Sequence, residues 1–174
     1  MNFEELYHAH KKMVYNLALQ YVQHSEDAQE ISQDVFVSIH QNLASFENRS
    51  KLSTWIYRIT INKSLDFIKT KKRKKRFGFF TALFHEESGE IIHEAASFDH
   101  PGILMEHKEA FETLFKLINE LPVNQRTALI LSKIEQKPQS EVAEIMNLSV
   151  KAVESLIQRA KTNLTQKLKN NEGI

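Results

Sequence analysis

One stretch of the chain combines basic and aromatic side chains at a density that suits binding to a polyanion. Residues 51–76 contain ten Lys or Arg and one acid, Asp66, so the stretch carries +9 while the whole 174-residue chain carries +1. Trp55, Tyr57 and Phe67 are interspersed among these charges. Basic side chains neutralise phosphates, and aromatic faces stack on unpaired bases. The stretch therefore indicates nucleic-acid binding, with a solvated charge run as the alternative for its C-terminal part.

The same stretch has the periodicity of a long amphipathic helix. Apolar residues recur at three- and four-residue spacing, at Leu52, Ile56, Ile59, Leu65 and Ile68. This pattern predicts one helix that turns these residues toward a core and its charged residues elsewhere. We expect Trp55 to belong to the core side, because it is in phase with the apolar stripe. Tyr57 is out of phase, and we expect it on the surface.

A second region, residues 139–161, has the residue types of a helix-turn-helix. Ala143 is small where two helices must cross closely, and Asn147, four positions later, tolerates the positive φ of the turn. Ser149 is a good N-cap for the second helix, and we expect Val153 and Leu156 to hold that helix against the first. The agreement of small, turn, cap and core positions favours duplex DNA binding over ordinary helical packing.

Composition limits the fold and the compartment. The chain is 41% hydrophobic, has four Gly and three Pro, and has no Cys. Few turn residues and long helical periodicities predict an all-α fold. The lack of Cys excludes disulfides and thiolate zinc sites, which fits a reducing compartment. No apolar run is long enough to span a bilayer and no signal peptide begins at Met1, so we expect a cytoplasmic protein without stable membrane insertion.

Charge divides the chain into alternating blocks. Residues 1–50 sum to −4, 51–76 to +9, 77–125 to −7 and 126–174 to +3. Two basic blocks that bracket an acidic one suit a protein with two DNA contacts, or one whose acidic segment shields its own basic face.

These blocks predict two small helical domains joined by a linker. The expected boundaries are an N-terminal domain at 1–76, an acidic and aromatic linker at 77–104 and a C-terminal helix-turn-helix domain at 105–170. Four Phe lie within residues 77–84. We expect them to dock on one of the domains, and a site for a partner protein is the alternative.

The N-terminal domain should begin with two helices. The first should run from Phe3 to near Gln23, and the second should follow Ser25 as its N-cap. The second helix places Asp27, Glu30 and Asp34 on one face. Taken alone, three acids at this spacing indicate an ordinary solvated surface.

The chain resembles the extracytoplasmic-function (ECF) sigma factors, the small specificity subunits of bacterial RNA polymerase. The run Thr54-Trp55-Ile56-Tyr57-Arg58-Ile59, with Asn62, Asp66 and the basic tail, is similar to the helix that reads and holds open the nontemplate strand of the minus-ten element. Residues 27–36 are similar to the segment that grips the clamp helices of the polymerase, and residues 139–161 to the minus-thirty-five-reading domain.

The resemblance assigns residues to three contacts. For core polymerase they are Asp27, Glu30, Gln33 and Asp34. For minus-ten DNA they are Lys51, Tyr57, Arg58, Asn62, Lys63, Asp66, Lys71, Lys72 and Arg73, with the loop Glu47 to Ser53 as the pocket for a flipped base. For minus-thirty-five DNA they are Lys151, Glu154, Ser155, Gln158, Arg159 and Lys161.

Two residues depart from the family pattern. Pro138 stands where many relatives have a Ser or Thr cap, and proline suits a first helical turn. Glu154 stands where a basic residue is frequent, and it could accept a hydrogen bond from cytosine N4. The identity of the bases that are read therefore stays open.

The resemblance implies a sigma factor that binds core RNA polymerase and directs it to promoters, reading duplex DNA and trapping melted single strand. The alternatives are a free-standing helix-turn-helix regulator and a protein that binds only protein partners. Whether an anti-sigma factor also binds stays open. We expect no enzymatic activity and no cofactor, because no nucleophile motif or phosphate loop occurs. The eight His lack metal-ligand spacing, so no metal site is expected.

Overall fold

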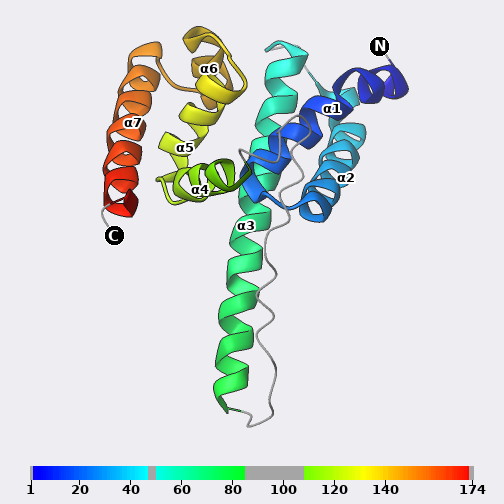
Figure 1. Cartoon of the computed structure of the whole chain (residues 1–174). Coiled ribbons are helices and arrows are strands. Elements are labelled where there is room, and N and C mark those ends of the chain that lie inside the picture. The colour runs from blue at the N-terminus through cyan, green and yellow to red at the C-terminus, as the bar shows by residue number, and fades with distance from the viewer. Residues whose placement is uncertain (1, 47–49, 85–107, 173–174) are drawn as a thin grey trace. The chain divides into compact units, whose positions relative to one another are not determined.

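A computed structural model describes residues 2–46, 50–84 and 108–172 (Figure 1). The described residues are helical and contain no strand, which confirms the predicted all-α fold. The elements in order are α1 (Phe3–Val22), α2 (Ser25–Asn42), the 3-10 turn η1 (Leu43–Ser45), α3 (Leu52–Phe84), α4 (Lys108–Asn119), α5 (Val123–Leu129), the π-helical turn η3 (Ile130–Ile134), α6 (Gln139–Met146) and α7 (Val150–Glu172).

The chain forms two compact units. The first unit comprises Met1–Gln41 and Thr60–Asp99, and the second comprises Asn42–Ile59 and His100–Ile174. The first two turns of α3 thus belong to the second unit, and the rest of that helix belongs to the first. Within the described ranges, no helix has both the length and the apolar character needed to cross a membrane.

Local signals set the ends of α1 as the sequence predicts. Asn2 forms a capping box with Glu5, whose backbone N–H donates to Asn2 Oδ1 at 2.8 Å. Gln23 ends the helix in the left-handed conformation at φ 56°, and its N–H donates to the Leu19 carbonyl. The buried side of α1 includes Leu6, Val14 and Leu17.

The start of α2 differs by one residue from the prediction. Ser25 is the first helical residue rather than the N-cap, and His24 precedes it. The His24 carbonyl accepts from the Ala28 N–H at 3.0 Å, and His24 Nδ1 accepts from the Asp27 N–H at 3.5 Å. Ala28, Ile31, Val35 and Ile39 are buried, as their helical spacing predicts, and Phe36 joins them. Leu43, which the same spacing places on the buried side, is only half-buried and lies in η1.

The long helix α3 corrects two predictions. It continues to Phe84, whereas the sequence pattern places its end at Arg76 and the linker from residue 77. The side chains of the Phe-rich segment and the linker beyond residue 84 lie outside the described residues. The predicted docking of these phenylalanines therefore stays a prediction.

The buried face of α3 is also rotated from the predicted stripe. Of the stripe residues only Ile56 is buried. The other buried residues of α3, among residues 52–76, are Thr54, Tyr57, Thr60, Ile61 and Ser64. Small residues permit the close approach of two helices. The hydroxyl of a buried Ser or Thr can donate a hydrogen bond to a backbone carbonyl of its own helix. Ser64 Oγ donates to the Thr60 carbonyl at 2.8 Å, so its burial leaves no unpaired donor.

The C-terminal helices pack around their own apolar core. Phe115 and Ile118 of α4, Ala128 of α5, Leu131 of η3 and Val153 of α7 are all buried. The short helices α5 and α6 both pack against α7. This core supports the helix-turn-helix formed by α6 and α7.

Candidate polymerase and promoter interfaces

The turn between α6 and α7 has the geometry that the sequence predicts. Asn147 adopts φ 54° and ψ 47°, in the left-handed region. The next N–H, that of Leu148, donates to the Ala143 carbonyl at 3.0 Å and satisfies the end of α6. Ser149 Oγ accepts from the Ala152 N–H at 3.2 Å, which is the predicted N-cap of α7. Val153 is fully buried and holds α7 against the core.

The outer face of α7 presents every residue assigned to minus-thirty-five DNA. All six are exposed: Lys151, Glu154, Ser155, Gln158, Arg159 and Lys161. Buried Val153, Ile157 and Ala160 alternate with them at helical spacing. A helix held by one face with a polar opposite face can enter a major groove and reach base edges.

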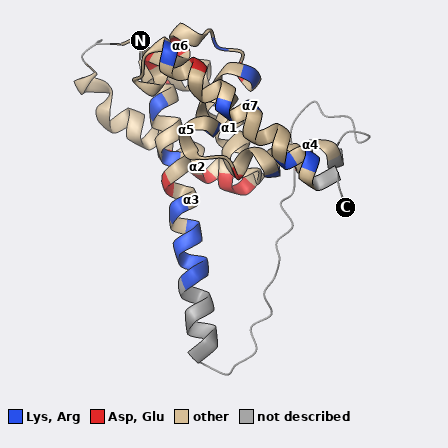
Figure 2. Ribbon diagram, turned by 90° about the vertical axis from the view of Figure 1, so that its left-hand side faces the viewer, with Lys and Arg blue, Asp and Glu red and all other residues tan. Residues whose placement is uncertain are grey.

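The basic part of α3 forms a continuous exposed stretch in the first unit (Figure 2). Five consecutive basic residues, Lys72, Arg73, Lys74, Lys75 and Arg76, are all exposed. Asn62 and Asp66 are exposed as well, and Asp66 faces Lys69 at 3.4 Å. Both members of that pair are open to solvent, so it adds little stability.

Residues assigned to polymerase and to DNA line one hollow within the first unit. Glu30 and Asp34 of α2 face Lys63, Asp66 and Lys71 of α3 across a hollow of about 480 Å³. The family resemblance assigns the acids of α2 to polymerase and the residues of α3 to DNA, as two separate surfaces. Because the two sets of charges are close together, each can affect the binding of a charged partner to the other.

Asp27 and Lys71 are joined within the same unit. Lys71 Nζ lies 2.6 Å from Asp27 Oδ2, and the Asp27 side chain is only 15% exposed. His24 Nδ1 lies 3.8 Å from the other carboxylate oxygen. Asp27 was predicted to contact polymerase and Lys71 to contact DNA, but in this structure they neutralise each other.

Tyr57 lies in the second unit and is buried, so the prediction that it is a surface residue is wrong. It is 4% exposed, and its hydroxyl donates to Glu135 Oε2 at 2.9 Å. Lys137 Nζ lies 4.9 Å from the ring centroid. Burial and the Glu135 carboxylate raise the pKa of Tyr57 well above its usual range. The aromatic ring is therefore not available for stacking on a base.

Arg58 is also engaged with protein atoms of the second unit. Its Nε donates to the Ile145 carbonyl at 3.1 Å, and its terminal nitrogen donates to the Glu144 carbonyl. A cation at the carbonyl end of α6 is favoured by the helix dipole. Trp55, predicted to be in the core, is half-buried with its ring 4.9 Å from that of Phe46.

Comparisons with known proteins identify the family of the chain. The chain matches the family models Sigma-70 region 2 over residues 6–74 and Sigma-70, region 4 over residues 111–164. It is 30% identical over 146 residues to the ECF RNA polymerase sigma-E factor of Escherichia coli (strain K12), covering 83% of this chain and 75% of the relative. The chain belongs to the ECF sigma factors. It is therefore a promoter-recognising sigma factor for RNA polymerase.

Further relatives extend the match over nearly the whole sigma factor. It is 28% identical to the ECF RNA polymerase sigma factor SigW of Bacillus subtilis (strain 168), over 97% of this chain and 89% of the relative. Its fold is similar to that of the sigma factor RpoE of Bartonella quintana, solved in complex with the anti-sigma factor NepR. The TM-score is 0.64 at 22% identity, with 96% of each chain covered. The predicted family and helical fold are thus confirmed.

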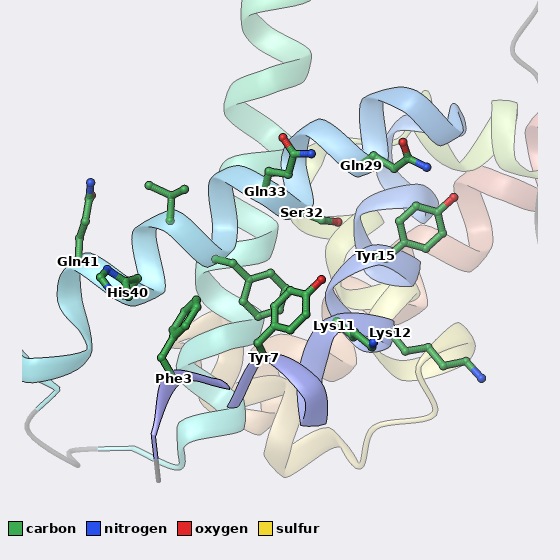
Figure 3. Close-up of a pocket in the computed structure, with 12 residues that line it drawn as sticks. Phe3, Tyr7, Lys11, Lys12, Tyr15, Gln29, Ser32, Gln33, His40 and Gln41 are labelled. Atoms are coloured by element: carbon green, nitrogen blue, oxygen red, sulfur yellow. The ribbon is translucent and has the colours of Figure 1, made fainter. Parts of the chain in front are cut away.

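Some exposed apolar residues lie outside the predicted contacts. Leu148, in the turn before α7, is 38% exposed, and Val150, the first residue of α7, is 43% exposed. Apolar residues at the first positions of a recognition helix could have signalled contact with thymine methyl groups. An aromatic groove between α1 and α2, lined by Phe3, Tyr7 and Phe36, was also missed, because its residues read as ordinary core positions (Figure 3).

Two further predictions concern the loop for a flipped base and the lack of a metal site. Part of the predicted flipped-base loop, residues 47–49, lies outside the described residues. Among the described residues, no group of three or more His, Cys, Asp or Glu is arranged to hold a metal ion.

Proposed function

We propose that this sigma factor is a non-enzymatic cytoplasmic subunit that contacts core RNA polymerase through Glu30, Gln33 and Asp34. In this proposal α3 engages the minus-ten element and the outer face of α7 reads the minus-thirty-five element. The anti-sigma complex of the Bartonella relative supports the further proposal that an anti-sigma factor sequesters this chain.

One observation carries the promoter assignment. The predicted reading face of α7 is exposed along its length while the opposite face is buried, with a left-handed turn and a capped helix start ahead of it. The helix α3, with five consecutive exposed basic residues, suits binding to melted DNA. A regulator that binds only duplex DNA does not need such a helix.

The polymerase assignment rests on exposed acids. Glu30, Gln33 and Asp34 are all exposed on α2, and two of them carry charge that complements a basic partner. Because Asp27 is joined to Lys71, we leave it out of the direct contact and propose that it positions α3.

Run-off transcription with purified core polymerase tests the function. We expect transcripts from a cognate promoter only when this chain is added. Glu30→Lys with Asp34→Lys should abolish both co-elution with core enzyme and transcription. The matched control, Glu4→Lys with Glu26→Lys, reverses two other exposed acids and should leave both unchanged. Duplex binding without any transcript would support a free-standing regulator instead.

A further inference from the structure

One residue on the outer face of α7 differs in charge from the rest of that face. The six exposed residues assigned to DNA there are Lys151, Glu154, Ser155, Gln158, Arg159 and Lys161. Glu154 is the only acid among them, while three are basic and suit phosphates. A carboxylate that is brought close to phosphates is repelled unless it meets a hydrogen-bond donor. Glu154 therefore requires a donor when this face approaches DNA.

The carboxylate of Glu154 is available for such a donor. Glu154 is exposed, and within the described parts of the chain no hydrogen bond or ion pair holds its side chain. Residues three and four positions away are its neighbours on the helix surface. Two of them cannot pair with a carboxylate, because Val150 is apolar and Ile157 is buried. The protein thus presents an unpaired acid on the face that reads DNA.

Stabilisation of α7 itself does not account for an acid at this position. The helix dipole favours carboxylates in the first turn, whereas Glu154 lies in the second turn of a helix that begins at Val150. Four positions later the helix has Gln158, not a Lys or Arg that would form a stabilising ion pair with Glu154. The role of the acid is therefore sought in a contact outside the chain.

The major groove of DNA offers a carboxylate only two donors. They are the N4 amino group of cytosine and the N6 amino group of adenine, because guanine and thymine present acceptors on their own edges. An ionised carboxylate only accepts hydrogen bonds. Adenine places the acceptor N7 beside its amino group, and this acceptor repels the second carboxylate oxygen. Cytosine has no such acceptor beside N4, so its edge complements Glu154 best.

We propose that Glu154 is a specificity-determining residue that selects a cytosine in the upstream promoter element. The basic residues of the same face carry donors, so they suit guanine or phosphates and cannot make this selection. The inference rests on the proposed function, because it takes the outer face of α7 as the reader of that element. It adds the identity of one base, which follows from the charge and the exposure of Glu154.

Selection of duplex sequences tests the base preference. The full chain, assembled with purified core polymerase, selects from a duplex library randomised across the promoter region, and the bound sequences are compared position by position. We expect one upstream position at which the wild type prefers cytosine by about fivefold or more. At that position Glu154→Gln should prefer adenine and Glu154→Arg should prefer guanine, because these side chains match the edges of those bases. The matched controls, Glu120→Gln and Glu120→Arg, change an exposed acid of α4 and should select the wild-type sequence.

A base analogue gives a second, independent readout. A cytosine analogue without the N4 amino group, placed at the selected position, should weaken wild-type binding by about fivefold or more and leave binding of Glu154→Ala unchanged. Equal losses for the two proteins would overturn the proposal.

The selection can also contradict the proposal. A wild-type preference for another base at the position that the variants change, or the same preferences in wild type, Glu154→Gln and Glu154→Arg, would overturn it. A shared upstream element would still support the proposed function in that case, whereas bound sequences without any upstream element would contradict both. Circular dichroism of each variant checks that helix content is unchanged.

Discussion

The two helices assigned to promoter DNA, α3 and α7, differ in how many of their assigned residues are exposed. On α7 all six assigned residues are exposed. On α3 Tyr57 is buried, and Arg58 and Lys71 are bonded to protein atoms, while Asn62, Lys72 and Arg73 are exposed. The recognition helix is oriented by a turn and core positions only a few residues away. The helix α3 is oriented by contacts with residues distant in sequence. The spacing of its apolar residues therefore predicts its exposed face less well than in α7.

The largest expected effect comes from the exposed basic residues of α3. Replacing Lys72, Arg73, Lys74 and Lys75 with Gln should weaken holoenzyme binding to promoter DNA roughly a hundredfold, and should reduce the salt slope by about 3 to 4. The measurement is binding at several salt concentrations. Lys116→Gln with Lys133→Gln, two exposed lysines of the second unit, is the control. An unchanged salt slope would show that this part of α3 does not contact phosphates.

Asn62 tests whether the exposed face of α3 acts on melted DNA. Asn62→Ala should leave polymerase binding intact and reduce run-off transcription from linear duplex by about tenfold or more, because contacts to an unstacked base are worth a few kcal/mol. A template already unpaired at the minus-ten element should restore most of the activity. Asn124→Ala, at an exposed position of α5, is the control. Wild-type transcription from linear duplex would contradict the assignment.

Arg159 tests the complementary face of α7. Arg159→Ala should weaken binding to duplex with the upstream element by about 1–3 kcal/mol and relax specificity at one base pair. Lys169→Ala, an exposed basic residue near the end of the same helix, should have little effect on specificity. A uniform loss over all sequences would identify Arg159 as a phosphate contact.

Val150 tests whether α7 contacts the methyl group of a single thymine. It is the first residue of α7 and is 43% exposed. If it contacts a thymine methyl, replacing that thymine with uracil should cost the wild type about 1 kcal/mol. The same replacement should cost Val150→Ser nothing measurable. Equal losses for both proteins at every thymine of the upstream element would exclude this contact.

The smallest expected effect concerns the ion pair between α2 and α3. Asp27→Asn should lower the free energy of unfolding by at most about 1 kcal/mol, because Lys71 is 40% exposed and the pair is partly screened. Thermal unfolding measures this. Asp66→Asn, which removes a fully solvated pair with Lys69, is the matched control and should change stability less. Equal effects would mean that burial of Asp27 adds nothing to the pair.

The family, the all-helical fold and the exposed face of α7 could be predicted from the sequence. The turn at Asn147, the cap at Ser149 and the buried Val153 are local features, since each depends on residues within a few positions. Alternation of charge also predicted two DNA contacts, and this stays a prediction. Local chemistry is readable because propensity, capping and helical spacing act over one or two turns.

Only the tertiary structure decided which side of α3 is buried and which charges are already paired. Thr60 and Ser64 are fully buried while Ile59 and Leu65 are only half-buried, and the spacing of apolar residues does not encode this choice of face. Asp27 and Lys71 lie 44 positions apart in sequence, yet 2.6 Å separates their charged atoms. The groove between α1 and α2 arises in the same way, because residues with core-like spacing stay exposed where no third element of the described chain covers them.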